Sequence, residues 1–151
     1  MENIYNPPLV AAVLSWFIAQ LIKVLINVIQ HKKLNVERFL GAGGMPSSHS
    51  AAVCALAAGL GVTEGVNSPM FALAFVLAVI VMYDASGVRR AAGMHAREIN
   101  KIKDAISDIF MKRNVEEKKK YLKEFIGHSP LEVFFGAIFG IAMGIVFTMY
   151  S

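Results

Sequence analysis

A histidine and a glutamate stand four residues apart in the segment GHSPLEVFFG, residues 127–136. Residues four apart share one face of a helix, so the Glu132 carboxylate can orient the His128 imidazole and stabilise its positive form. An imidazole held in this way can act as a nucleophile toward phosphorus. The segment also predicts a helix start, because Ser129 and Glu132 form a capping box and Pro130 suits the first helical position. The two interpretations are compatible, since a cap fixes the geometry that a nucleophile needs.

A second polar segment, GGMPSSHSAA at residues 43–52, places two serines and a histidine between a glycine pair and an apolar run. Proline and serine commonly start helices, so Ser47 or Ser48 is expected at the N-terminus of the following helix. Free backbone N–H groups and the helix dipole favour an anion there. His49 stands in the first turn and could give a proton to a leaving oxygen. The alternative interpretation is an ordinary capped helix with an incidental histidine.

Three cations complete the set of residues that could bind an anion. Lys23 lies in an apolar segment, where an ammonium costs about 2.5–3.5 kcal/mol by insertion scales, so it should face a partner or a wet cavity. The alternative is that Lys23 snorkels to the nearby interface. Arg89 and Arg90 could be a topology signal or lipid-headgroup contacts, but guanidinium is also the best planar donor for phosphate oxygens. The combination therefore favours a phosphate group as the ligand.

The elements that carry these residues are predicted to be membrane helices. The chain of 151 residues is 56% hydrophobic with a mean hydropathy of +0.53, which is too apolar for an ordinary soluble domain. Uncharged or nearly uncharged runs predict a single all-α integral membrane domain over 1–151, with about four spans at 7–30, 48–63, 66–86 and 130–150. The 48–63 run is short and rich in Ala and Gly, so it should be buried among the other helices. A single cysteine supports no metal cluster.

Small residues recur at four-residue spacing in the last span, at Gly136, Gly140 and Gly144. Such a ladder allows two helices to approach closely. It could serve either packing inside one chain or a homodimer seam.

A polar insertion at about 88–127 separates the last two spans. Ile99, Ile102, Ile106 and Ile109 follow helical spacing with charged positions opposite, which predicts an amphipathic helix. That helix could lie on the membrane surface or cover a site. The EEKKKYLKEF stretch predicts a further helix whose charges form a solvated face.

The distribution of basic residues predicts the topology. Apart from Lys23, every Lys and Arg falls within 32–38 or 89–123. The positive-inside rule places both segments in the cytoplasm, with both chain ends outside. The net charge of +4 is explained in this way, so no nucleic-acid partner is expected. The candidate site residues all fall at or near the cytoplasmic ends of spans, where they could meet.

In sequence, these segments resemble the type 2 phosphatidic acid phosphatase superfamily, which includes lipid phosphatases and vanadium haloperoxidases. PSSH at 46–49 is similar to that family's P-S-G-H block, with Ser48 replacing glycine, and HSPLEVFFG at 128–136 is similar to its H-x-P-x-D-V-x-x-G block, with Glu132 replacing aspartate. The segments GGMPSSHSA, DASGVRRAAG and GHSPLEVFFG together resemble a divergent, small bacterial branch over nearly the whole chain.

Two features depart from the family pattern. The arginine expected six residues before the nucleophilic histidine is absent, since residue 122 is leucine, and Arg89 or Arg90 would supply it. The spacing Arg89-x5-His95 makes His95 the alternative nucleophile, although Ile99 stands near the place of its carboxylate. Lys23 is the choice for the family's phosphate-binding lysine, with Arg38 as a second candidate from the loop.

The resemblance implies a phosphatase of the cytoplasmic (inner) membrane that uses no metal or other cofactor, with its active site facing the cytoplasm. His128 would be the nucleophile, Glu132 its orienting group and His49 the general acid. The substrate phosphate would be bound by Lys23, Ser47, Ser48, Arg89 and Arg90. The expected substrate is a lipid phosphomonoester such as phosphatidylglycerophosphate or phosphatidate, or an isoprenyl diphosphate, and a homodimer could complete the site. Haloperoxidase activity is not expected, because it would need vanadate bound in a soluble setting. The alternative function is a non-catalytic lipid-headgroup binder or transporter.

Overall fold

A computed structural model describes residues 5–31, 44–111, 121–122 and 127–151. Within these ranges all the regular secondary structure is α-helical, as expected for an all-α membrane protein. The helices are α1 (Pro7–His31), α3 (Ser48–Thr63), α4 (Pro69–Ser86), α5 (Val88–Met111) and α6 (Pro130–Met149). Three helical stretches, Pro7–Ile29, Pro69–Ile106 and Pro130–Met149, are long and apolar enough to cross a membrane, and α3 is a shorter apolar helix.

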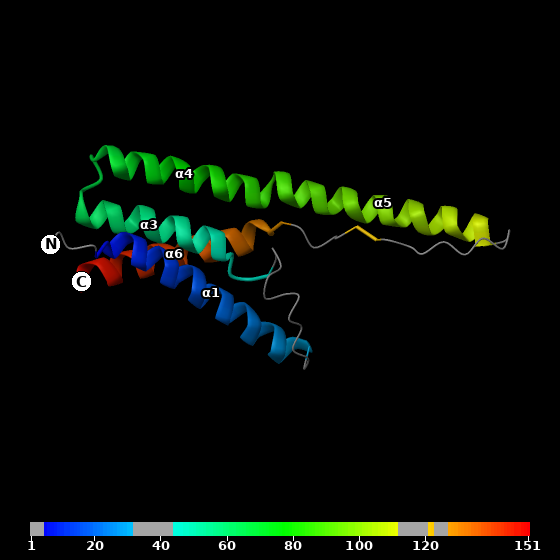
Figure 1. The fold of residues 1–151 in the computed structure, drawn as a ribbon, viewed down its shortest axis with the longest axis horizontal. Coiled ribbons are helices and arrows are strands. Elements are labelled where there is room, and N and C mark those ends of the chain that lie inside the picture. The colour runs from blue at the N-terminus through cyan, green and yellow to red at the C-terminus, as the bar shows by residue number, and fades with distance from the viewer. Residues whose placement is uncertain (1–4, 32–43, 112–120, 123–126) are drawn as a thin grey trace.

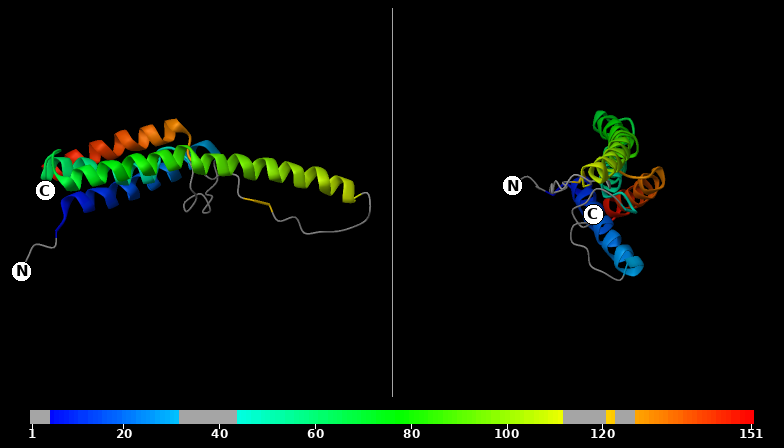
Figure 2. Two further views of the ribbon diagram at one scale, coloured as in Figure 1. Left: turned by 90° about the horizontal axis from the view of Figure 1, so that it is seen from above. Right: turned by 90° about the vertical axis from the view of Figure 1, so that its right-hand side faces the viewer.

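Helix α3 is the centre of the bundle. It packs against α1, α4 and α6, while among the described residues α1 makes no contact with α4. α1 and α4 run in one direction, and α3 and α6 run in the other (Figures 1 and 2). The two described ends of the chain meet at one end of the bundle, where the Tyr5 hydroxyl donates to Ser151 Oγ across 3.1 Å.

The glycine ladder of α6 lies directly against the backbone of α3. A Cβ atom added at any of the three glycines would overlap a backbone oxygen of α3 or of its N-cap residue, Ser47. The contacts pair Gly136 with Ser47, Gly140 with Ala51 and Gly144 with Ala55. These glycines are therefore occupied by packing inside one chain, so they do not form a seam for a second copy.

Helices α4 and α5 follow one another almost end to end (Figure 1). Only Gly87 separates them, with a non-helical φ of −102° and ψ of −86°. α5 then extends beyond the bundle on the side opposite the chain ends (Figure 2). The further helix expected in the insertion falls mostly outside the described residues, and the two described members of that stretch, Tyr121 and Leu122, are not helical.

The length of α3 sets the depth of its polar N-terminus. A helix of 16 residues is about 24 Å long, which is less than the roughly 30 Å of a hydrocarbon core. α1 has 25 residues and reaches beyond the start of α3 at the same end of the bundle (Figure 1). The start of α3 is therefore recessed relative to the end of α1.

Candidate active site

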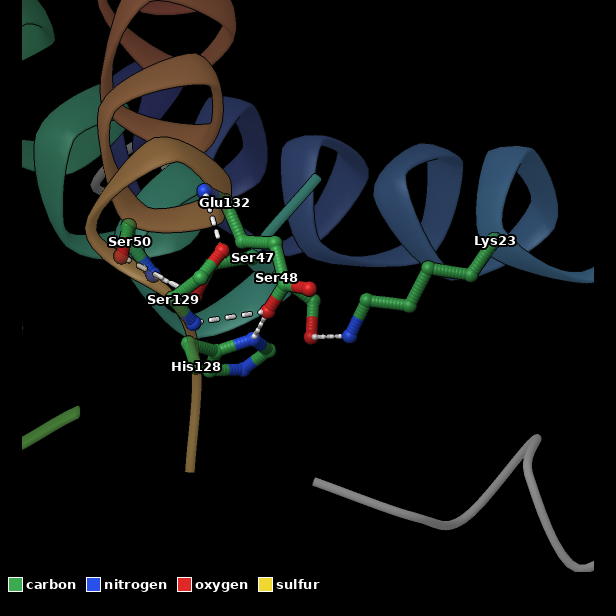
Figure 3. A network of polar contacts seen from close by, with 7 residues as sticks. All are labelled: Lys23, Ser47, Ser48, Ser50, His128, Ser129 and Glu132. Carbon is green, nitrogen blue, oxygen red and sulfur yellow. Dashed lines mark hydrogen bonds and ion pairs between the residues drawn. The ribbon is translucent and has the colours of Figure 1, made fainter. Parts of the chain in front are cut away.

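The start of α6 fixes His128 beside Glu132. Ser129 is the N-cap of α6: its hydroxyl accepts from the Glu132 backbone N–H, while the Glu132 carboxylate accepts from the Ser129 N–H across 3.1 Å, which completes the expected capping box. The same carboxylate oxygen, Oε2, lies 2.9 Å from Nδ1 of His128 (Figure 3). One glutamate oxygen therefore holds both the helix cap and the imidazole ring.

His128 is buried and has one unpartnered nitrogen. The residue is only 2% exposed, and its backbone N–H donates to the Ala85 carbonyl across 3.0 Å, which ties the start of α6 to the end of α4. Within the part of the chain that the structure describes, the ring atom Nε2 has no hydrogen-bond partner. Leaving a buried polar atom unpaired costs about 1–3 kcal/mol, and such atoms require a functional or structural explanation.

The surroundings of His128 favour the neutral imidazole. Burial lowers the pKa of His128 from its ordinary value of 6.5, and the hydrogen bond to Glu132 opposes this effect. The positive charges of Lys23 and Arg89 lower the pKa further. A neutral ring whose Nδ1–H donates to the carboxylate carries its lone pair on Nε2.

The serine-rich segment is joined to α6 through the backbone. The Ser47 N–H donates to the Glu132 carbonyl across 2.9 Å. Ser47 is the N-cap of α3: its hydroxyl accepts from the Ser50 N–H and from the Ser50 hydroxyl. Since Ser47 is fully buried, the structure gives its hydroxyl a capping position at the junction of the two helices.

Lys23 faces a partner inside the bundle. Its ammonium donates to the Ser48 hydroxyl across 3.1 Å, and both residues are buried, at 8% and 1% exposed (Figure 3). Lys23 lies eight residues before the end of α1, which is about 12 Å along the helix axis. The ammonium is therefore recessed in the bundle rather than directed to the aqueous end of its helix.

Three members of the candidate set, His49, Arg89 and Arg90, are exposed. His49 is within electrostatic range of Lys23, Arg89 and His128. The Arg89 Nε donates to Asp84 across 2.6 Å, with half of its side chain accessible. Most of the candidate residues are therefore gathered at the end of the bundle from which α5 leaves.

Two candidates lie elsewhere. His95 is exposed on α5, ten residues beyond Ala85, which is about 15 Å along nearly continuous helix. The structure does not bring it to the cluster around Glu132. Arg38 lies outside the described residues.

Two residues of the site were not singled out from the sequence. Gly127 has a φ of +101°, and a Cβ there would overlap the backbone of Arg90, so it allows the segment before His128 to lie against the start of α5. Ser50 supports the cap of α3 through Ser47. The only sequence signal for either residue is its place beside a histidine.

The fold and the cluster define a small helical integral membrane protein with a buried histidine–carboxylate pair and a buried lysine at one end of its bundle. The chain belongs to the Divergent PAP2 family, whose family model matches residues 4–143. It is 43% identical over 156 residues to a Bacillus subtilis (strain 168) protein described as the uncharacterized membrane protein YuiD, with 99% of each chain covered. No solved structure matches the chain significantly.

Proposed function

We propose that this protein is a membrane lipid phosphatase that hydrolyses a phosphomonoester through a phosphohistidine intermediate, without a metal ion. The observation that carries the proposal is the state of His128, whose Nδ1 lies 2.9 Å from Glu132 while the buried Nε2 has no partner among the described residues. That arrangement leaves a lone pair directed away from the carboxylate that orients the ring. Membership of the Divergent PAP2 family supports the same chemistry.

In the first step, Nε2 of His128 attacks phosphorus, an N–P bond forms and the bond to the ester oxygen breaks. His49 gives its proton to the leaving alkoxide. The Glu132 carboxylate stabilises the positive charge that develops on the ring. In the second step His49 takes a proton from water, the water oxygen attacks phosphorus, and the N–P bond breaks to release phosphate and restore His128.

Charge on the transferring group would be stabilised by the cations around the cluster. Lys23 and Ser48 supply donors from the buried side, and Arg89 and Arg90 supply guanidinium groups from the exposed side. Ser47 acts by fixing the start of α3 against Glu132. Arg89 would keep its ion pair with Asp84 through Nε and present its remaining N–H groups to phosphate.

The recessed position of Lys23 favours a lipid substrate over a soluble one. A phosphate that reaches this ammonium lies below the end of α1, at the depth of a lipid headgroup. The substrate class is therefore a phosphomonoester with an apolar tail in the bilayer, of the phosphatidylglycerophosphate or phosphatidate type. The positive-inside rule, applied to the basic segments, supports a site that faces the cytoplasm at the inner membrane.

One observation favours a second candidate function, a lipid-headgroup binder or transporter without turnover. Nε2 is fully shielded in this structure, so the nucleophile needs a local rearrangement before it meets phosphorus. A binder would need only the cations on the exposed side of the cluster.

The experiment is phosphate release from a panel of short-chain and native lipid phosphates in detergent with EDTA present. His128→Ala is compared with His95→Ala, which removes an exposed histidine outside the cluster. We expect His128→Ala to abolish release and His95→Ala to retain it. Loss only in His95→Ala would move the nucleophile to α5, and no release from any lipid would favour the binder.

A trapping measurement separates the mechanism from mere loss of structure. Labelled substrate should leave acid-labile, base-stable phosphate on wild-type protein and none on His128→Ala, while both proteins elute alike in size-exclusion chromatography. Label retained on His128→Ala would contradict the assignment of the nucleophile.

A further inference from the structure

Helix α5 projects from the bundle with an exposed apolar stripe. Its 24 residues are about 36 Å long, and among the described helices it contacts α4 alone. Ile99, Ile102 and Ile106 are 43%, 58% and 46% exposed. Contiguous exposed apolar residues on a helix are typical of interaction sites.

The described residues that follow α5 cover a different side of the helix. The Asn100 side chain pairs with the Leu122 backbone in both directions, at 2.9 and 3.0 Å, and the Tyr121 hydroxyl donates to Asp104 across 2.7 Å. Asn100 is only 4% exposed as a result. At 100° per residue, Asn100 and Asp104 point away from the isoleucine stripe. Among the described residues, the isoleucine stripe therefore stays exposed while the opposite side of α5 is covered.

The spacing of the stripe fits packing against another helix. Steps of four and three residues alternate without interruption over three heptads, and the residues at these positions are Val88, Ala92, His95, Ile99, Ile102, Ile106 and Ile109. A period of 3.5 residues keeps a narrow seam facing a partner helix along its length. A helix that lies on a membrane or a globular core carries a wider apolar face.

The charges beside the seam fit a second copy of this chain in parallel orientation. Every copy crosses the membrane the same way round, so helices that continue α4 into the same compartment run parallel. In a parallel coiled coil, the residue just before a seam position on one helix faces the residue five positions later on the partner helix. Glu98 stands just before the seam residue Ile99, so it would face Lys103 of the other copy. Glu98 now pairs with Lys101 on its own exposed surface, and such a pair is weak enough to be exchanged.

We propose that this protein self-associates through a parallel coiled coil of α5 helices, with the isoleucine stripe as its seam and Glu98–Lys103 pairs between copies. Isoleucine at both seam positions favours three or four helices over two. His95 lies in this seam, so its role would be in self-association. The glycine ladder of α6 takes no part, because α3 occupies it. The proposal does not depend on the phosphatase activity.

Cysteine cross-linking in native membranes tests the seam. In a Cys54→Ala background, Ile102→Cys places a thiol in the seam, and Lys101→Cys places one on the neighbouring exposed position outside it. Mild oxidation should give a disulfide-linked pair with Ile102→Cys and none with Lys101→Cys. Equal cross-linking of both variants, or of neither while both are present in the membrane, would overturn the proposal.

Charge reversal provides a second test that leaves the apolar stripe intact. Glu98→Lys should reduce the oligomer found by light scattering in mild detergent, because it opposes Lys103 of the neighbouring copy. The double variant Glu98→Lys/Lys103→Glu should restore it. An unchanged mass in all three proteins would contradict the proposal. If Ile102→Cys gives no cross-link and is also protected from a membrane-impermeant maleimide, the isoleucine stripe is covered by something other than a second copy.

Discussion

The Lys23 ammonium donates to the Ser48 hydroxyl across 3.1 Å, which joins the interior of a membrane-crossing helix to the first residue of α3. Neither residue has more than 8% of its surface exposed. A buried charge of this kind needs its hydrogen-bonding partner. The pair therefore explains how a lysine is tolerated in an apolar helix and why it points toward His128.

Lys23→Met should separate catalysis from stability. Replacing the buried ammonium with an apolar side chain of similar length removes its desolvation cost, so the apparent Tm in detergent should be unchanged or higher. Phosphate release should fall about 10²–10³-fold, the usual effect of losing one donor to a developing negative charge. A large loss of Tm with proportionate loss of activity would indicate a structural lysine.

Ser48→Ala should show the opposite pattern. It leaves the Lys23 ammonium without this acceptor, and an unsatisfied buried polar group costs about 1–3 kcal/mol. The apparent Tm should fall, and Ser48→Thr should restore much of it because the hydroxyl is kept. The comparison of the two variants in thermal unfolding tests the bond, and an equal Tm in both would contradict it.

The acid limb of the activity profile should lie below pH 6.5. Burial lowers the pKa of His128 from that ordinary value. At pH 6.5 the His128 ring is therefore neutral, and able to attack, in more than half of the molecules. Activity should fall only as the pH drops through the lowered pKa and the ring becomes protonated. The measurement is kcat/KM against pH, and an acid limb above 6.5 would contradict the assignment.

Glu132→Gln should move the acid limb of the activity profile to lower pH. The carboxylate raises the pKa of His128 through its hydrogen bond and its charge, so its removal should lower the pKa and shift the acid limb to lower pH. The rate should also fall, since the ring loses the group that stabilises its positive form. An unchanged limb in Glu132→Gln would show that Glu132 does not act on the titrating group.

Gly140→Ala should destabilise the bundle. The added Cβ would overlap the backbone of Ala51, and overpacking of this kind costs about 1–3 kcal/mol. Ala142→Leu is the control, because Ala142 is exposed on the same helix and a larger apolar side chain can face lipid there. Thermal unfolding in detergent should show a lower Tm for the first variant alone, and equal effects would contradict the packing of α6 on α3.

Features set by neighbouring residues could be predicted from the sequence. The all-α membrane class depends on long apolar runs, and the cap of α6 depends on Ser129, Pro130 and Glu132, which lie within four residues of one another. The His128–Glu132 pair follows in the same way, since their spacing fixes a shared helix face. Each of these features is local, because the interacting groups are held by one stretch of backbone.

Only the tertiary structure decided how distant segments meet. It joined Lys23 to Ser48 and Ser47 to Glu132, and it assigned the glycine ladder to packing within one chain. It also placed His95 on α5, away from the cluster around Glu132. The spacing between Arg89 and His95 had made His95 the alternative nucleophile. These outcomes depend on which helix faces are buried together, and no residue spacing within one helix contains that information.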